Sequence, residues 1–113
     1  MLLKMSSILK DLIVLEIANN HMGDVNHGIN LIDTYSKICD KFKHLNFAFK
    51  FQYRDLETFI HKSLKNDLNN HYVKRFSEPR LTESNFNKLV QKIKSNSYQA
   101  MVTPFDNNSL KLI

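Results

Sequence analysis

Four polar residues of this 113-residue chain stand at or near the ends of apolar, strand-like stretches: Glu16, Lys50, Gln52 and Thr103. In parallel α/β architectures, functional groups gather at the carboxyl ends of the strands, where the connecting loops lie. A carboxylate, a cation, an amide and a hydroxyl that converge at such an edge are suited to bind a polar, anionic substrate. Asn20, in the polar cluster after the first stretch, is a fifth candidate, as a partner that supports the site from the loop.

The stretches that carry these residues are predicted to be β-strands. Residues 11–18 (DLIVLEIA) form a short apolar run that is typical of a buried strand. Over residues 45–53 aromatic side chains alternate with small or polar ones, which is the period-two signal of a strand. Residues 98–103 predict a third strand. Lys50 and Gln52 share one face of the second strand, so solvent or a ligand must meet them there.

Two helices are predicted between these strands. Over residues 25–42, with Asp24 as N-cap, apolar residues at steps of three and four describe one helical face: Val25, Ile29, Ile32, Tyr35, Ile38, Cys39 and Phe42. A second helix follows Thr82 as N-cap and ends at residues 96–97, with an apolar side formed by Phe86, Leu89, Val90 and Ile93.

The remaining segments are more polar. Residues 54–79 are interpreted as an excursion from the main fold, with a helix predicted over residues 56–68. Asp106 or Asn107 is predicted to begin a further helix. Strands that alternate with helices indicate an α/β fold with parallel pairing and right-handed crossovers. A complete (β/α)8 barrel needs roughly 200 residues or more, so a barrel interpretation must treat this chain as a part of one.

Three motifs, in this order, resemble those of the N-acetylneuraminate (sialic acid) synthase family, which includes the pseudaminic and legionaminic acid synthases. Residues 16–24 (EIANNHMGD) are similar to the family's E-I-x-x-N-H-x-G, although Ala18 stands where a Gly is common. Residues 50–52 (KFQ) resemble its K-x-Q, and residues 103–106 (TPFD) resemble its S/T-T-P-F. The segment after Arg54 does not align with the family's loop, so the contact to the sugar amide found there is not transferred.

The resemblance implies a fold and a reaction. Residues 1–113 would form the N-terminal portion of a (β/α)8 TIM barrel, with three strands and two to three helices. The C-terminal half of the barrel and an antifreeze-like domain would be absent from this chain. The enzyme type implied is a transferase that condenses phosphoenolpyruvate with an N-acetylated hexosamine, of the N-acetylmannosamine type, to a nine-carbon acidic sugar and releases phosphate. The fragment alone would be inactive.

The resemblance also implies roles for single residues. Lys50 would contact the anionic groups of phosphoenolpyruvate, and Thr103 would hydrogen-bond the same ligand. Gln52 and Glu16 would face the sugar and the reacting centre, so Glu16 and Lys50 are the catalytic candidates, and Asn20 would assist binding. A divalent metal, Mn or Mg, would serve the complete enzyme, with ligands from outside this chain. The complete enzyme would be a homodimer.

Ordinary structural roles compete with these assignments. Lys50 and Gln52 suit an exposed edge strand, where Lys blunts pairing. Glu16 could form a structural ion pair, and Thr103 could merely end a strand. His21, alone in a turn, is interpreted as a hydrogen-bonding residue and not as a metal ligand.

Two further groups of side chains have structural interpretations as well. The other histidines lack the spacing of a zinc site and are expected on the surface. The basic residues Lys74, Arg75 and Arg80 suit either a phosphate or partner patch or a solvated loop.

Composition excludes other classes. There are 16 Lys and Arg against 11 Asp and Glu, a net charge of +5, but the cations are scattered without a groove-reading motif, so nucleic-acid binding is not predicted. Charges interrupt the apolar start of the chain before the roughly 20 residues that span a bilayer, so no signal peptide or membrane association is expected. A single cysteine, Cys39, favours a reducing, cytoplasmic location. The alternative function is a non-catalytic α/β module that binds phosphate or a protein partner.

Overall fold

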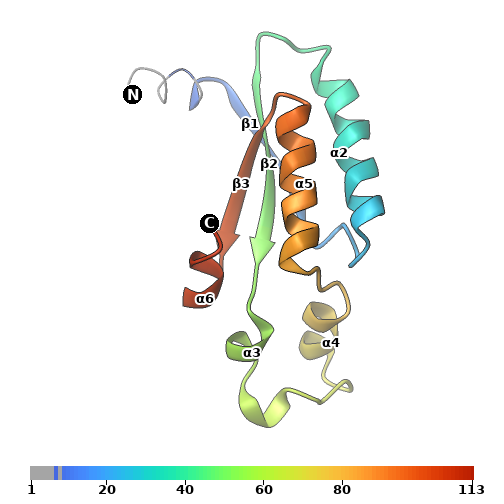
Figure 1. The fold of residues 1–113 in the computed structure, drawn as a ribbon, viewed down its shortest axis with the longest axis vertical. Helices are drawn as coiled ribbons and strands as arrows, with labels where there is room; N and C mark the ends of the chain where they lie inside the picture. Colours follow the sequence, from blue (N-terminus) through green and yellow to red (C-terminus); the bar gives the residue numbers. More distant parts are fainter. Residues whose placement is uncertain (1–6, 8) are drawn as a thin grey trace.

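A three-stranded parallel sheet forms the centre of the computed structural model, which describes Ser7 and residues 9–113. The strands are β1 (Leu12–Ala18), β2 (Asn46–Tyr53) and β3 (Gln99–Pro104), in the spatial order β1-β2-β3. β2 is therefore hydrogen-bonded along both edges (Figure 1). The predicted strands, their parallel pairing and the α/β class are confirmed.

Helices α2 (Val25–Cys39) and α5 (Glu83–Ser95) lie on the same side of this sheet (Figure 1). Both begin at the predicted N-caps. The Asp24 carboxylate accepts hydrogen bonds from the amides of the first turn of α2, and the Thr82 hydroxyl accepts one from Asn85 N at 3.2 Å. These contacts satisfy amides that have no partner within the helix, which fixes where each helix starts.

The buried face of α2 agrees with the prediction in part, because Ile32 and Cys39 are buried and Val25 and Ile29 pack against the core. The helix ends at Cys39 instead of Phe42, and Tyr35 and Ile38 are exposed, as is Phe42. The buried residues form a stripe shifted around the helix: Gly28, Ile32, Ser36 and Cys39. The neighbouring helix packs closely at Gly28. A Cβ atom there would lie 2.9 Å from Leu89 Cδ2, so a larger residue would have to displace the end of the Leu89 side chain.

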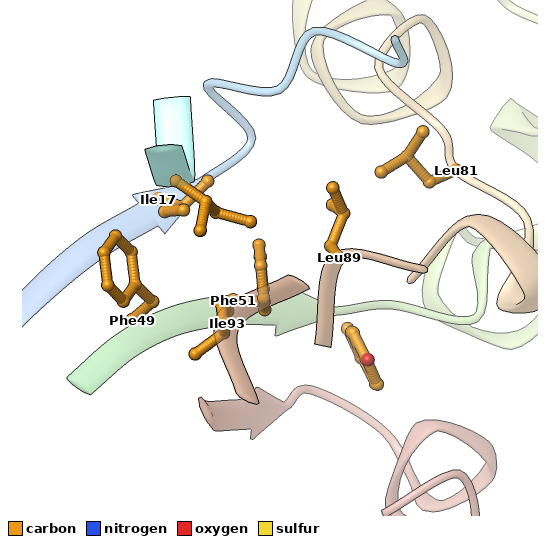
Figure 2. Close-up of a cluster of buried hydrophobic side chains, with 8 residues drawn as sticks. Ile17, Phe49, Phe51, Leu81, Leu89 and Ile93 are labelled. Atoms are coloured by element: carbon orange, nitrogen blue, oxygen red, sulfur yellow. The ribbon is translucent and has the colours of Figure 1, made fainter. Parts of the chain in front are cut away.

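Aromatic residues of β2 form the core with these helices. Phe49 and Phe51 are fully buried and meet Ile17 of β1 on one side and Leu89 and Ile93 of α5 on the other (Figure 2). Burial of one such side chain stabilises the fold by about 1.5–3 kcal/mol relative to its exposure. Because successive side chains of a strand point to opposite faces, the period-two pattern of residues 47–53 turns every aromatic side chain of β2 toward the helices.

The segment after β2 is not the single helix predicted over residues 56–68. It contains α3 (Leu56–Phe59), a 3-10 turn η1 (Lys62–Leu64) and α4 (His71–Ser77). Ile60 has extended backbone angles and ends α3, and Asn70 caps a new helix by accepting hydrogen bonds from two amides of α4. A small second core joins these pieces, formed by Leu56, Ile60 and Val73 with Phe76 packed against it.

A polar clamp joins the ends of β2 and β3. Asp106 caps the short helix α6 (Asn107–Leu110), as predicted, and its Oδ2 also accepts the amide of Asp55 at 2.7 Å. Asn108 Nδ2 donates to Asp55 Oδ2 at 2.6 Å. The two loops that leave neighbouring strands are thereby held together at the carboxyl edge of the sheet.

No helix in the described part of the chain has the length and apolar character that crossing a membrane requires. The expectation that the apolar start of the chain forms no membrane anchor concerns, in part, residues 1–6 and 8. These residues lie outside the described part of the chain. Cys39 is buried and not disulfide-bonded, and burial raises the pKa of its thiol.

Ala18 ends β1 in a left-handed conformation, with φ of 47°. This conformation costs a residue with a Cβ atom roughly 1–2 kcal/mol, whereas glycine adopts it freely. Ala18→Gly is therefore expected to raise the free energy of unfolding by about 1 kcal/mol, measured by urea denaturation.

Ala100→Gly in β3 is the matched control. It removes the same methyl group from an ordinary strand position and should lower the free energy of unfolding by about 0.5–1 kcal/mol. Equal losses from both substitutions would contradict a strained Ala18.

Candidate functional site

Glu16 and Lys50 form an ion pair between neighbouring strands. They are register partners in β1 and β2, and Lys50 Nζ lies 2.8 Å from Glu16 Oε2. Glu16 Oε1 also accepts the amide of Ala18 at 3.1 Å. Both side chains remain partly exposed, at 30% for Lys50 and 39% for Glu16. The pair is thus accessible from the side of the sheet that the helices leave open.

Gln52 and Thr103 are register partners one pleat farther along. Strand side chains alternate between faces, so Lys50 and Gln52 lie on the face opposite the buried aromatic residues of β2. The register places Glu16 and Thr103 beside them on that same face. Four of the sequence candidates are thereby brought together on one surface of the sheet.

A cavity of about 870 Å³ opens at the carboxyl ends of β1 and β2. Asn20 and Gln52 line it, whereas Glu16, Lys50 and Thr103 do not. The rest of its wall comes from the end of β1 and the loop after it, from the residue after β2, from the region of α4 and from the start of the loop after β3: Ala18, Asn19, Met22, Arg54, Tyr72, Arg75, Phe76, Glu78, Pro79 and Phe105. The candidates therefore divide into two groups: the Glu16–Lys50 ion pair and Thr103 lie on the sheet, and Asn20 and Gln52 lie at the cavity.

Arg54, which was not among the candidates predicted from the sequence, links the sheet to this cavity. Its Nη2 donates to Gln52 Oε1 at 2.7 Å. Its guanidinium carbon lies 4.0 Å from the ring centre of Phe105, 4.5 Å from that of Phe76 and 5.6 Å from that of Phe59. All three distances are within the range of cation–π attraction. In the sequence, Arg54 is recognisable only as a cation directly after a predicted strand. Its aromatic partners cannot be predicted there, because they come from three separate segments.

His21 is a buried structural residue of the first loop, in agreement with the interpretation made from the sequence. It is 1% exposed, its Nδ1 accepts the amide of Gly23 at 3.1 Å, and its ring meets the edge of Phe86. Burial, helped by the nearby His27, lowers its pKa to about 4. Gly23 has φ of 75°, and a Cβ atom there would lie 3.1 Å from the Glu78 carbonyl oxygen, so this turn requires glycine.

Within the described residues, no group of three or more His, Cys, Asp or Glu side chains is placed to hold a metal ion. The remaining histidines are exposed: His27, His44, His61 and His71.

Two solved structures are similar to the chain over most of its length. One is N-acetylneuraminic acid (sialic acid) synthetase from Leptospira borgpetersenii in complex with citrate, with 22% identity and a TM-score of 0.68 over 90% of this chain; that likeness concerns the fold. The other is described provisionally as spore coat polysaccharide biosynthesis protein E from Chromobacterium violaceum, with 48% identity and a TM-score of 0.86 over 92% of this chain. The chain matches the N-terminal portion of proteins in the sialic acid synthase family.

The three parallel strands and their helices thus correspond to part of the TIM barrel of the sialic acid synthase family. The chain spans 31% of the length of each of the two solved structures. Comparison with protein-family models gave no match, and neither did comparison with curated proteins.

His21 predicts a specific acid sensitivity. In the unfolded chain it accepts a proton near pH 6.5, but in the folded protein only near pH 4. Between these values the unfolded state binds more protons, so stability is complete above pH 6.5 and falls as the pH drops toward 4. The loss attributable to His21 is about 3 kcal/mol, at about 1.4 kcal/mol per pH unit.

His21→Asn tests this assignment, because the Asn side chain can still accept the Gly23 amide in a turn but does not titrate. The variant is expected to lose stability at pH 7 through poorer packing. Its free energy of unfolding, measured by urea denaturation, should vary less between pH 6.5 and 4.5 than that of the unmodified protein. His44→Asn, at an exposed position, should keep the original pH dependence. An unchanged slope in His21→Asn would contradict the assignment.

Proposed function

We propose that the complete protein to which this chain belongs condenses phosphoenolpyruvate with the aldehyde of an open-chain N-acetylated hexosamine. In this reaction C3 of phosphoenolpyruvate forms the new bond to the aldehyde carbon, water adds at C2, and phosphate leaves. Residues 1–113 would supply the first part of the catalytic barrel. The observation that carries the proposal is the placement of Glu16, Lys50, Gln52 and Thr103 on one face of a parallel sheet.

Lys50 is the proposed contact for the anionic groups of phosphoenolpyruvate. Its ammonium group is partly exposed and is compensated by a single carboxylate, Glu16, at 2.8 Å. A partly exposed ion pair of this kind contributes little to stability, typically 0–1 kcal/mol, so its partners can exchange for a ligand at low cost. A phosphate that engages Lys50 would leave Glu16 free to act at the reacting centre.

The neutral candidates complete the arrangement. The Thr103 hydroxyl would bind phosphoenolpyruvate from the adjacent strand. Gln52 Oε1 accepts a hydrogen bond from Arg54, which directs the amide nitrogen of Gln52 to serve as the donor toward an oxygen of the sugar. Asn20, from the loop after β1, would contribute a further amide at the cavity.

A divalent metal would polarise the aldehyde in the complete enzyme. The described residues hold no group of three ligating side chains, so the metal ligands would come from the part of the complete enzyme outside this chain.

Turnover of the complete gene product tests the reaction. Phosphoenolpyruvate and N-acetylmannosamine, supplied with Mn²⁺ or Mg²⁺, are expected to release inorganic phosphate and to form a nine-carbon keto acid, measured by phosphate assay and mass spectrometry. Binding of phosphoenolpyruvate without phosphate release under either metal would favour the non-catalytic binding module instead.

Lys50→Ala is expected to raise the apparent KM for phosphoenolpyruvate by about 30-fold, because a hydrogen bond to a charged group contributes about 2 kcal/mol. Initial rates at varied phosphoenolpyruvate concentration check this. Lys94→Ala removes the same charge from an exposed position near the end of α5 and should leave the KM unchanged. If the two variants gave the same KM, Lys50 would have no place in the site.

A further inference from the structure

The cavity at the end of β2 holds cations without matching carboxylates. Among the described residues, neither Arg54 nor Arg75 forms an ion pair, although both line the cavity. The one carboxylate in the lining, Glu78, lies 3.7 Å from Lys74. The cavity therefore carries two guanidinium groups against one acid that already has a cationic neighbour.

Arg54 in particular is compensated only by groups without a formal charge. Its partners are the carbonyl oxygen of Gln52 and three aromatic rings, and its Nε is buried without a hydrogen-bond partner in the described part of the chain. Burial and the positive charge of Arg75 both lower the pKa of this guanidinium, which nevertheless stays protonated. The two neighbouring positive charges at the cavity wall repel each other and make the local electrostatic potential positive, which favours binding of an anion.

The neutral polar groups of the lining match the same ligand. Gln52 offers its amide N–H groups, since its oxygen is engaged by Arg54, and Asn19 and Asn20 add further side-chain amides. Guanidinium and amide donors together fit a tetrahedral oxyanion, which accepts several hydrogen bonds at once. Phe76 and Phe105 hold the Arg54 side chain in place, so less of its rotamer freedom is lost when a ligand binds.

We propose that this cavity is an anion-binding site of its own, centred on Arg54 and Arg75, which takes a phosphate group. It differs from the proposed phosphoenolpyruvate contact at Lys50. Arg54 follows Lys50 by four positions in an extended chain, a length of about 13 Å. The phosphate is either free inorganic phosphate or the phosphate group of a phosphorylated amino sugar, since both present the same oxyanion to the two arginines.

Calorimetric titration of the complete gene product without phosphoenolpyruvate tests this site separately from catalysis. The ligands are inorganic phosphate, N-acetylmannosamine 6-phosphate and N-acetylmannosamine. At least one phosphate ligand is expected to bind more than about tenfold tighter than the unphosphorylated sugar. Tighter binding of the sugar phosphate identifies a substrate-borne group, and equal or tighter binding of inorganic phosphate identifies the free ion.

Substitutions locate the binding. Arg54→Gln and Arg75→Gln should each weaken binding of the preferred phosphate ligand, by about tenfold and about threefold respectively, whereas Lys94→Gln, at an exposed position of α5, should not. Arg75 is exposed, so its variant decides the matter if Arg54→Gln does not fold. Absence of any preference for phosphate, or unchanged binding in both arginine variants, would overturn the proposal.

Discussion

The central strand β2 is paired on both edges, and this pairing constrains everything around it. A strand hydrogen-bonded on two sides cannot rotate or slip without breaking both ladders, so its alternation is locked. The aromatic face of β2 must be covered, and α2 and α5 cover it, packing closely against each other where Gly28 meets Leu89. The opposite face is thereby assigned to Lys50 and Gln52, whatever those side chains do there.

The register of the two outer strands then decides which chemistry that face carries. In β1, Glu16 falls opposite Lys50; in β3, Thr103 falls opposite Gln52. A shift of one residue in either strand would turn Glu16 or Thr103 toward the helices. The polar clamp between Asp55 and the loop that holds Asp106 fixes the carboxyl ends of β2 and β3 relative to each other. The register that stabilises the helix-covered core therefore also fixes the geometry of the open face.

Local patterns in the sequence were sufficient for the features that depend on neighbours along the chain. The alternation of residues 47–53 and the caps at Asp24 and Thr82 predicted β2, α2 and α5 because each signal lies within the element it defines. The buried stripe of α2 depends on its contact with α5, which is distant in the sequence. The apolar positions of α2 therefore predicted Ile32 and Cys39 correctly but also included Tyr35 and Ile38, which are exposed. Arg54 escaped notice for the same reason. The aromatic rings that hold it belong to α3, α4 and the loop after β3, and only the folded chain brings them together.

Lys50 of β2 and Arg54, which directly follows β2, differ in how their positive charges are balanced. This difference affects how each of them can bind an anionic ligand. Lys50 faces a carboxylate, so an anion that approaches it must first compete with Glu16. Arg54 faces aromatic rings, which attract a cation by about 0.5–2 kcal/mol and leave its net charge in place. An anion therefore meets no competing carboxylate at Arg54. The two sites therefore differ in what an anion must displace: the Glu16 carboxylate at Lys50, and no carboxylate at Arg54.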